Sequence, residues 1–370
     1  MKYKSIYFVT TESIKNLGNF RNYLIENTDY LVTFHFPHGY LKKASYMEIY
    51  KKGKISQRKE FYRYPGKTNM VKLGLYYLYF NYIVFKYVKK ESFIIVENPI
   101  FCIFNSLAAL TKRVKFIFWV GDYFPDNTGF MWFYNKIADF YNKNLKYVLY
   151  VSPPLYKHYM SVLLEKDKKT KYRAVFTLGV KKRYNAKKTF NKLSKKIVLG
   201  FIGVIRKKQG LELAFEYLSK SSNVGLEIIG DGYSLGYYID LAKKLNIEHR
   251  IKFYGFVEDI DPIIKNWDIG LALYKDSKDN VSKYCEPVKI KNYLEYGIPV
   301  ITTKTTYFSK EITRFDAGKV IDETTNNLAS AVEDIKQHYK KYTDGVDRIV
   351  SEYEPNRLYD QYFSFIAEQK

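Results

Sequence analysis

The sequence predicts an α/β protein built from two doubly wound domains, each with a parallel sheet covered by helices. Three observations support this fold class. At 370 residues the chain exceeds the usual size of a single domain. Short apolar runs alternate with helix-length amphipathic stretches in both halves, a pattern typical of parallel sheets. A polar, strongly basic run at residues 181–196 separates the two alternations and predicts a linker.

In the N-terminal half, five apolar runs are too short to be helices and are expected to form strands. Helix-length segments lie between them, among them residues 70–90 and 131–144. The first domain is therefore expected to span residues 1–185. The expected strands are residues 5–10, 30–36, 93–98, 115–120 and 147–152.

Residues 70–90 are about long enough to span a membrane, but Lys72, Asn81 and Lys86 interrupt them. Such side chains are costly at bilayer depth, so a membrane span is disfavoured. Two alternatives remain open. The segment is either a helix packed on the sheet, or an interfacial helix with aromatic side chains at the level of the lipid headgroups.

The same alternation recurs in the C-terminal half, which predicts a second domain over residues 195–350. Ligands of doubly wound sheets bind beyond the carboxyl ends of the strands, so the loops that follow the strands matter most. The expected strands lie within residues 197–204, 224–232, 251–257, 268–274 and 298–303, and the expected helices are residues 211–218, 234–247 and 261–267.

A short helix of about nine residues is expected to begin at Pro287 and to end before Gly297. Proline suits the first turn because its missing N–H would be unsatisfied there, and glycine suits the left-handed position after a helix. Pro299 prevents any continuation. The free N–H groups and the positive dipole end of such a helix can hold a diphosphate, and Lys289 adds a cation in the first turn.

The loop after the strand at 197–204 also suits phosphate binding. Gly203 and Gly210 frame a loop that contains Arg206 and Lys208, and a second glycine turn follows at residues 230–232. Small residues let a ligand approach the backbone, and cations suit phosphate oxygens. Close packing of Gly203 and a solvated basic face are the alternatives for the single features. Together, at the ends of successive strands, they favour a nucleotide diphosphate.

As a set, these motifs resemble the donor domain of family-4 glycosyltransferases of the GT-B fold. The series FIGVIRKKQG, LEIIGDG, RIKFYGFV, DIGLALY and PVKIKNYLEYGIPVITT covers about residues 200–305. In the first half, WVGDYFPD (119–126) is similar to the acidic loop of the family, and FTLGV (176–180) to its strand and glycine before the linker. The final stretch resembles the terminal helices of the family, which implies that a helix at about 355–370 returns to the first domain.

The resemblance implies two Rossmann-like domains that face each other across a cleft. It further implies sugar transfer from a UDP-, GDP- or related donor, with retention at the anomeric carbon and with no obligatory metal or other cofactor. The nucleotide would bind the second domain and the acceptor the first. The residues expected near the donor, from these motifs and from the resemblance together, are Gly18, Gly203, Arg206, Lys208, Val257, Pro287, Val288, Lys289 and Asn292.

The chain departs from the family in the phosphate-binding loop. The family commonly has an arginine directly after the first glycine and a lysine directly before the second. These positions are Val204 and Gln209. Arg206 and Lys208 are the nearby cations that we expect to replace them.

The two glutamates of the family, eight positions apart, fall on Tyr284 and Asn292. The amide of Asn292 can still hydrogen-bond ribose hydroxyls. Glu286, two places after Tyr284, is the candidate that stands in for the first glutamate. The alternative is that Glu286 caps the following helix.

In the predicted reaction, cations and helix N–H groups stabilise the negative charge that grows on the leaving diphosphate. Glu286 would bond the sugar or balance the positive anomeric centre. Asp122 or Asp126 would assist deprotonation of the acceptor hydroxyl, and a plain surface-loop carboxylate is the alternative for either. His35 and His38 follow an apolar strand and either contact a ligand or are structural.

The net charge of +23 is distributed unevenly. Residues 1–190 contain 34 Lys and Arg against 12 Asp and Glu, whereas residues 191–370 contain 27 against 26. This asymmetry indicates a polyanionic partner for the first half, or else a solvated basic surface. A lipid-pyrophosphate acceptor at an anionic membrane face fits it. No nucleic-acid-binding motif is recognisable, so no nucleic acid partner is expected.

The sequence therefore predicts a nucleotide-sugar-dependent glycosyltransferase of bacterial surface-polysaccharide assembly, with a lipid-linked glycan as acceptor. Two cysteines, Cys102 and Cys285, form no disulfide framework or zinc motif, and the first strand is too short and polar for a signal peptide. We expect a cytoplasmic protein, peripheral on the inner face of the cell membrane. The alternatives are a nucleotide-sugar epimerase or phosphorylase of similar shape, and a basic binding protein without enzymatic activity.

Overall fold

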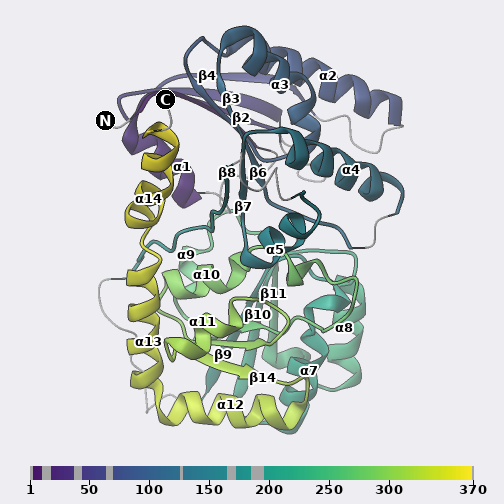
Figure 1. The fold of residues 1–370 in the computed structure, drawn as a ribbon. Coiled ribbons are helices and arrows are strands. Elements are labelled where there is room, and N and C mark those ends of the chain that lie inside the picture. Colours follow the sequence, from purple (N-terminus) through teal and green to yellow (C-terminus); the bar gives the residue numbers. More distant parts are fainter. Residues whose placement is uncertain are drawn as a thin grey trace. The chain divides into compact units, whose positions relative to one another are not determined.

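The chain forms two compact units (Figure 1), seen in a computed structural model. Between Gly179 and Val180 the chain passes from unit 1 to unit 2, and most of the expected linker, residues 185–195, lies outside the described part. The structure describes residues 3–10, 18–36, 44–63, 70–125, 128–164, 172–184 and 196–368. Unit 1 comprises residues 1–179, 284–286 and 358–370, and unit 2 comprises residues 180–283 and 287–357.

Unit 1 is built on a mixed sheet with the strand order β4-β3-β2-β1-β5-β6-β7-β8. The strands from β2 to β8 in this order run parallel, whereas β3 and β4 are added as an antiparallel hairpin. The five strands expected from the sequence are all present. The bounds are β1 (Tyr3–Thr10), β2 (Thr28–His35), β3 (Ala44–Lys51), β4 (Lys54–Arg63), β5 (Phe93–Val96), β6 (Lys115–Val120), β7 (Tyr147–Tyr150) and β8 (Tyr172–Val175).

Three strands of unit 1 were not predicted. The hairpin of β3 and β4 ends in an exposed edge strand whose sequence, KISQRKEFYR, is charged rather than apolar. Charged side chains are typical of sheet edges because they prevent pairing with other chains, but they hide the strand from a search for apolar runs. The strand β8 ends at Val175, so residues 176–180, expected as a strand, follow it instead.

Helices cover both faces of this sheet. On one face, Phe20 of α1 contacts the rings of Phe8 and Trp119, and Phe363 of α14 packs against Phe20. On the other face, Phe118 of β6 contacts α4. The helices of unit 1 are α1 (Gly18–Asn27), α2 (Met70–Tyr87), α3 (Pro99–Lys112), α4 (Gly129–Asn144), α5 (Pro153–Ser161) and α14 (Pro355–Glu368), of which α14 enters unit 1 at Leu358.

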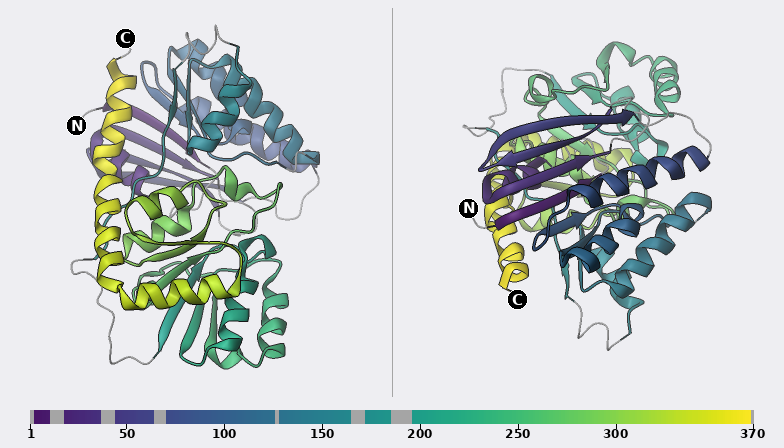
Figure 2. Two further views of the ribbon diagram at one scale, coloured as in Figure 1. Left: turned by 60° about the horizontal axis from the view of Figure 1, so that its bottom comes forward. Right: turned by 90° about the horizontal axis from the view of Figure 1, so that it is seen from above.

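Two of these helices begin where the sequence supplies a cap. Asn98 precedes α3 and its side chain accepts a hydrogen bond from the N–H of Ile100, and Ser152 does the same for Leu155 at the start of α5. A proline follows each cap, where its missing N–H costs nothing. The helices α2, α3 and α4 then lie side by side along the sheet (Figure 2).

The helix α2 packs on the sheet through Tyr76, Phe80 and Val84, which are buried. The interpretation of residues 70–90 as a packed helix is therefore confirmed. In the described part of the chain, no helix is long and apolar enough to cross a membrane.

Unit 2 contains a parallel sheet with the strand order β11-β10-β9-β12-β13-β14. The strands are β9 (Ile197–Ile202), β10 (Val224–Ile229), β11 (Ile251–Gly255), β12 (Ile269–Ala272), β13 (Val300–Thr303) and β14 (Gly318–Ile321). The helices are α7 (Leu211–Lys220), α8 (Leu235–Lys244), α9 (Asp261–Ile264), α10 (Val288–Glu295), α11 (Ser309–Arg314), α12 (Thr325–Gln337) and α13 (Tyr339–Glu352). This is the doubly wound arrangement that the sequence predicts.

Two apolar layers sandwich the sheet of unit 2. One contains residues of α7, α8 and α12, and the other residues of α9, α10, α11 and most of α13. Glycines in the central strands admit large rings, since a Cβ at Gly200 would lie 1.9 Å from Trp267 and one at Gly270 would lie 2.3 Å from Tyr293. The strand order reverses between β9 and β12, so the loops that follow these two strands meet at one edge of the sheet.

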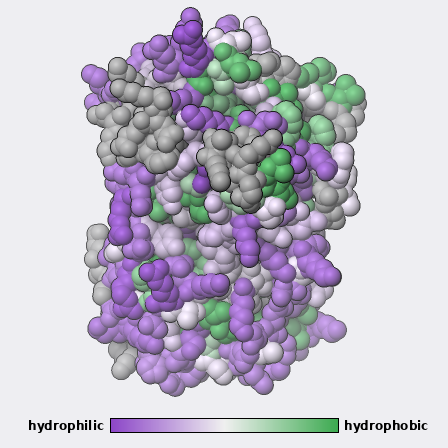
Figure 3. Space-filling view, in the orientation of Figure 1, coloured by the Kyte–Doolittle hydropathy of each residue, from purple (hydrophilic) through white to green (hydrophobic). Residues whose placement is uncertain are grey.

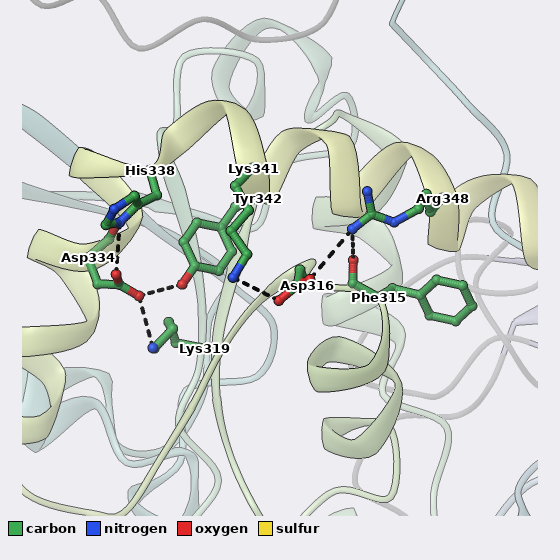
Figure 4. Close-up of polar contacts among 8 residues, drawn as sticks. All are labelled: Phe315, Asp316, Lys319, Asp334, His338, Lys341, Tyr342 and Arg348. Carbon is green, nitrogen blue, oxygen red and sulfur yellow. Dashed lines mark hydrogen bonds and ion pairs between the residues drawn. The ribbon is translucent and has the colours of Figure 1, made fainter.

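A polar network joins α12 and α13 to the sheet of unit 2 (Figure 4). The carboxylate of Asp334 accepts a hydrogen bond from the hydroxyl of Tyr342 and lies 2.9 Å from the Nζ of Lys319. The hydrogen bond from Tyr342, more than the charge of Lys319, lowers the pKa of Asp334 to about 2. Beside it, Asp316 pairs with Lys341 at 3.1 Å and with Arg348 at 3.7 Å. The corner between the two helices is therefore fixed by charge as well as by packing.

Candidate active site

The loops after β9 and β12 pack against each other at the reversal point of the unit 2 sheet. Gly210 has a φ of +67°, and a Cβ there would lie 1.9 Å from the carbonyl oxygen of Leu273. The N–H of Lys275 donates to the carbonyl oxygen of Lys208 at 3.0 Å. Ligands of doubly wound sheets bind at this point, where the chain leaves neighbouring strands in opposite directions.

The glycines of this edge have two different roles. A Cβ at Gly230 would lie 2.0 Å from the carbonyl oxygen of Gly203, and one at Gly232 would lie 2.4 Å from that of Ile205, so both are required by close packing. Gly203 has a φ of +136°, and the nearest atom to a Cβ there would be the Cε of Lys289, at 3.5 Å. The backbone of Gly203 therefore flanks the side chain of Lys289.

The helix α10 begins at Val288, one residue later than expected, with Pro287 as the residue before it. Its first backbone hydrogen bond runs from the N–H of Ile290 to the carbonyl oxygen of Pro287, at 2.9 Å. The N–H groups of Val288 and Lys289 precede this bond and belong to the first turn, where N–H groups have no partner within the helix. Gly297, with a φ of +74°, follows the helix as predicted.

Buried side chains hold α10 in place. The hydroxyl of Tyr293 donates to the carbonyl oxygen of Leu271 at 2.9 Å and accepts from the N–H of Ile202 at 3.2 Å, which ties the helix to β12 and β9. At the other end, Glu295 pairs with Arg183 at 2.9 Å. The N-terminus of α10 is thus fixed at the end of β9.

Lys289 is the cation that the structure places at this edge. Its Nζ donates a hydrogen bond to the side-chain oxygen of Gln209 and lies 4.1 Å from the ring centroid of Phe201 and 4.9 Å from that of Tyr274. Burial lowers the pKa of the Lys289 ammonium to about 7. Gln209 occupies the position where the resemblance leads one to expect a lysine, so Lys289 brings a cation to that place from another element.

The two predicted cations of the loop after β9, Arg206 and Lys208, contact other residues instead of Lys289 or Gly203. The Nζ of Lys208 pairs with the carboxylate of Asp279, and the exposed Arg206 lies with its guanidinium 5.8 Å from the ring centroid of Tyr233. Asn292 is partly buried three residues after Lys289, on the same side of α10. Val257 is partly buried at the end of the segment that follows β11 and packs on the core. Of the predicted donor residues, Gly203, Lys289 and the start of α10 are the ones that the structure brings together.

Glu286 lies in unit 1, although it is covalently bonded to Pro287. Its Oε2 accepts a hydrogen bond from the hydroxyl of Thr177 at 2.7 Å, just beyond β8. The hydroxyl of Ser152, beyond β7, donates to the carbonyl oxygen of Tyr284. The hydrogen bond with Thr177 favours a role of Glu286 in the site over the helix-capping alternative. The segment Tyr284–Glu286 instead sits at the carboxyl ends of two strands.

Asp122 follows β6 and lies close to this segment, because the ring of Tyr123 is 5.1 Å from that of Tyr284. Burial raises the pKa of the Asp122 carboxyl, which makes it a stronger base once it is ionised. A second carboxylate lies nearby: a Cβ on Gly121 would be 3.4 Å from the Oε1 of Glu97. Asp126, the other candidate in this loop, is outside the described residues.

Sequence reasoning missed Glu97 and Thr177. Glu97 comes directly after β5 and accepts a hydrogen bond from the Thr10 hydroxyl at 2.6 Å, at the end of β1. Its position after an apolar run was a usable signal, because loops at the carboxyl ends of such strands carry function. Thr177 gives no such signal, since its partner Glu286 is more than a hundred residues away in the sequence.

Two further candidates have structural surroundings in unit 1. Gly18 is the first residue of α1, and the side chain of the next residue, Asn19, donates to the carbonyl oxygen of Gly179 at 3.1 Å. His35 is buried, stacks on Tyr46 with a centroid distance of 4.5 Å, and burial lowers its pKa to about 3. Its burial and stacking favour the structural interpretation of His35. His38 lies outside the described residues.

Comparison with known families gives a match for part of the chain. Residues 182–348 match the family model described as glycosyl transferases group 1. This range contains Gly203, Gln209, Lys289 and the whole of α10. No curated protein sequence matches the chain.

Solved structures match the chain over nearly its full length. HepE from Anabaena in complex with UDP-glucose is 12% identical, with a TM-score of 0.68 over 98% of this chain and 99% of that one. A sucrose-phosphate synthase from Thermosynechococcus elongatus is 11% identical, with a TM-score of 0.71 over 99% and 98%. WaaG, a glycosyltransferase involved in lipopolysaccharide biosynthesis, is 11% identical, with a TM-score of 0.61 over 94% of each chain. At these identities the likeness concerns the fold, and it confirms the GT-B fold predicted from the sequence.

Proposed function

We propose that this GT-B-fold chain, whose residues 182–348 match glycosyl transferases group 1, is a glycosyltransferase that moves a sugar from a nucleotide-diphosphate donor to a hydroxyl of a lipid-linked glycan. We propose that the transfer retains the configuration at the anomeric carbon. The diphosphate of the donor binds unit 2, and the acceptor binds unit 1.

The position of Lys289 is the main support for the proposed donor site. Its ammonium lies beside the backbone of Gly203 and in the first turn of α10, at the reversal point of the sheet. A diphosphate there would receive one cation and the free N–H groups of Val288 and Lys289. These groups also stabilise the negative charge that the leaving nucleotide acquires. We therefore propose that the reaction needs no metal cofactor, and that a chelator leaves the rate unchanged.

The chemistry at the sugar is assigned to the carboxylates of unit 1. Glu286 is tied through Pro287 to the helix that holds the diphosphate, and we propose that it hydrogen-bonds the donor sugar or balances the positive anomeric centre. Thr177 orients it through the bond to Oε2. Asp122, with its raised pKa, accepts the proton of the acceptor hydroxyl, so turnover falls as the pH drops below that pKa.

The acceptor and the site of action follow from charge. The excess of Lys and Arg in residues 1–190, 34 against 12 acidic residues, supports a pyrophosphate-linked lipid acceptor and a position on the inner, anionic face of a bacterial membrane. The biological role that we propose is a step of surface-polysaccharide assembly in the cytoplasm. The family match favours transfer over the epimerase, phosphorylase and non-enzymatic alternatives.

A panel of nucleotide sugars tests the proposal directly. A ligand that binds only the folded protein raises its melting temperature, so UDP-glucose, the ligand of the HepE structure, and a set of UDP- and GDP-sugars are compared for thermal shift. We expect a shift with one nucleotide class. Product analysis with the donor alone and with a glycan acceptor then separates transfer from epimerisation and phosphorolysis. The absence of a shift with every nucleotide sugar would contradict the donor site.

A further inference from the structure

The helix α2 of unit 1 is apolar on two sides. Its inward side buries Tyr76, Phe80, Ile83 and Val84 against the sheet. Its outward side exposes Val71 (69%), Leu75 (60%), Leu78 (47%) and Tyr82 (61%). The spacing of four, three and four residues places these four side chains in one stripe. A helix that only covers a sheet needs one apolar side, so the outer stripe has no role in the packing of unit 1.

The stripe continues on the two neighbouring helices. Leu110 of α3 is 78% exposed, and Trp132, Phe133 and Phe140 of α4 are each about half exposed. Since α3 contacts both α2 and α4, these residues extend the same outer layer, and Figure 3 shows hydrophobic residues gathered over this part of unit 1. Contiguous exposed apolar surface is uncommon in proteins that work free in solution. We call these eight residues of α2, α3 and α4 the outer apolar face.

The same three helices carry almost exclusively positive charge. Their sequences contain one acidic residue, Asp139, whereas Lys72 and Lys86 lie in α2, Lys112 ends α3, and α4 contains two more lysines. Lys86 and Lys136 are exposed, and the Nζ of Lys136 lies 5.8 Å from the ring centroid of Trp132. Cations are thus interspersed with aromatic and aliphatic side chains on one surface.

We propose that the outer apolar face docks unit 1 onto a membrane that contains anionic lipids, an inference that deepens the proposed function by naming the surface that meets the lipid. Leu, Tyr and Trp side chains enter the boundary between headgroups and acyl chains, while the lysines contact lipid phosphates. The helices lie on the membrane rather than across it.

Charge decides between a membrane and a second copy of the chain as the occupant of this face. A symmetric dimer through the outer apolar face would bring the same lysine-rich helices of two copies together, with only Asp139 from each copy to offset them. Like charges in contact oppose such a dimer. Anionic headgroups complement the same lysines.

The tryptophans of the chain provide a direct test. The chain has three tryptophans, of which Trp119 and Trp267 are buried, whereas Trp132 on the outer apolar face is 47% exposed. We expect the emission of Trp132 to shift to shorter wavelength with vesicles of phosphatidylglycerol and phosphatidylcholine, and to shift less with phosphatidylcholine alone. The variant Trp132→Phe should lose the shift. No change in emission with the anionic vesicles would overturn the proposal.

Variants locate the surface. In vesicle co-sedimentation, Leu75→Gln with Leu78→Gln should weaken binding to anionic vesicles about tenfold or more, because two aliphatic side chains no longer enter the lipid. Lys86→Gln with Lys136→Gln should weaken it by a similar factor and flatten its dependence on salt. The matched control replaces two exposed apolar residues of unit 2, Tyr237→Gln with Phe256→Gln, and should bind as the wild type does.

The outcomes separate this inference from the proposed function. Circular dichroism and thermal melting show whether each variant folds, which exposed positions should allow. Equal vesicle binding by the Leu75/Leu78 variant and the unit 2 control overturns the docking surface, as does concentration-dependent dimerisation that the same variant abolishes. A protein that binds nucleotide sugar but not vesicles contradicts only the docking. A protein that binds vesicles but no nucleotide sugar contradicts only the glycosyl transfer.

Discussion

Units 1 and 2 are both doubly wound, yet they use charge in different ways. Residues 191–370, which form most of unit 2, contain 27 Lys and Arg against 26 Asp and Glu, and ion pairs such as Lys304–Asp322 use some of these cations internally. In residues 1–190, 34 basic residues stand against 12 acidic ones, so basic residues outnumber acidic ones almost threefold. In the proposed function, unit 2 directs Lys289 at a small anion, whereas unit 1 presents a broad basic and apolar surface to an extended partner.

This difference in charge between the two units indicates which unit determines specificity for the acceptor and the membrane. A nucleotide diphosphate has the same shape in every donor, and the groups proposed to hold it are backbone N–H groups and one lysine. An acceptor and a membrane differ from one system to another, and the corresponding surface is made of exposed side chains. Substitutions in each unit can test this contrast.

The strongest test of unit 1 as the catalytic partner is Glu286→Gln. Loss of the carboxylate charge should lower kcat about 100-fold or more, the lower range for a group that acts on the reacting atoms. The melting temperature should change little, because the amide oxygen still accepts the hydrogen bond from Thr177. Steady-state kinetics with the identified donor measure the effect. Thr177→Val, which removes only the positioning hydroxyl, should cost about tenfold. Wild-type turnover in the Gln variant would remove Glu286 from the site.

The proposed donor site of unit 2 is tested by replacing Lys289 and Lys208, one at a time, with methionine. Lys289→Met should weaken nucleotide-sugar binding about 10- to 100-fold, because it removes a charged hydrogen-bond donor from the diphosphate. Lys208→Met is the matched control, since Lys208 pairs with Asp279 and should change the affinity less than about threefold. Isothermal titration calorimetry gives both dissociation constants. The opposite order would mean that Lys208 leaves Asp279 to bind the donor.

The pH dependence of donor binding follows from the lowered pKa of Lys289. With a pKa of about 7, the free site holds the ammonium below pH 7 and mostly the neutral amine above it. A diphosphate binds the ammonium, so the affinity should fall as the pH rises from 6 to 8, by up to about tenfold. Calorimetry in two buffers of different ionisation enthalpy should also show proton uptake on binding at pH 8. A flat profile, or the same slope in Lys289→Met, would contradict this origin.

The smallest expected effect is on the stability of unit 2, through the hydrogen bond between Tyr342 and Asp334. Tyr342→Phe removes the hydroxyl that donates to Asp334 and should lower the free energy of unfolding by about 1 kcal/mol, measured by urea denaturation. The folded-state pKa of Asp334 lies below its ordinary value of 3.8. The stabilisation is therefore complete above that pH and is lost as the pH falls towards 2. Tyr237→Phe, on the exposed side of α8, should leave stability within about 0.5 kcal/mol.

The sequence predicted the elements that frame the proposed donor site of unit 2, because these elements depend on backbone geometry. Gly203 and Gly297 occupy left-handed positions, and Pro287 precedes a helix, so the local sequence marks each feature. The sequence could not rank the lysines. Lys208 and Lys289 look equally suitable until folding brings Asp279, 71 positions from Lys208, next to one of them.

The strands and the candidate site of unit 1 were harder to predict, because they depend more on contacts between residues that are far apart in the sequence. The charged edge strand β4 lacks the alternation that reveals a strand, and its pairing with β3 emerges only from the folded sheet. The contact between Thr177 and Glu286 joins residues 109 positions apart, for which no local pattern exists. What the sequence does reveal in unit 1, the charge excess and the apolar helix at 70–87, concerns its surface rather than its site.

The position of α14 also determines the order in which the protein can be completed during synthesis. The core of unit 1 includes Tyr359 and Phe363, whose rings pack on Phe20 of the first helix. During synthesis, Phe20 cannot pack against Tyr359 and Phe363 until the whole of unit 2, which lies between them in the sequence, has been made. Synthesis of unit 1 thus starts first, but its core is completed last. A chain truncated before Leu358 should expose an aromatic surface that favours aggregation.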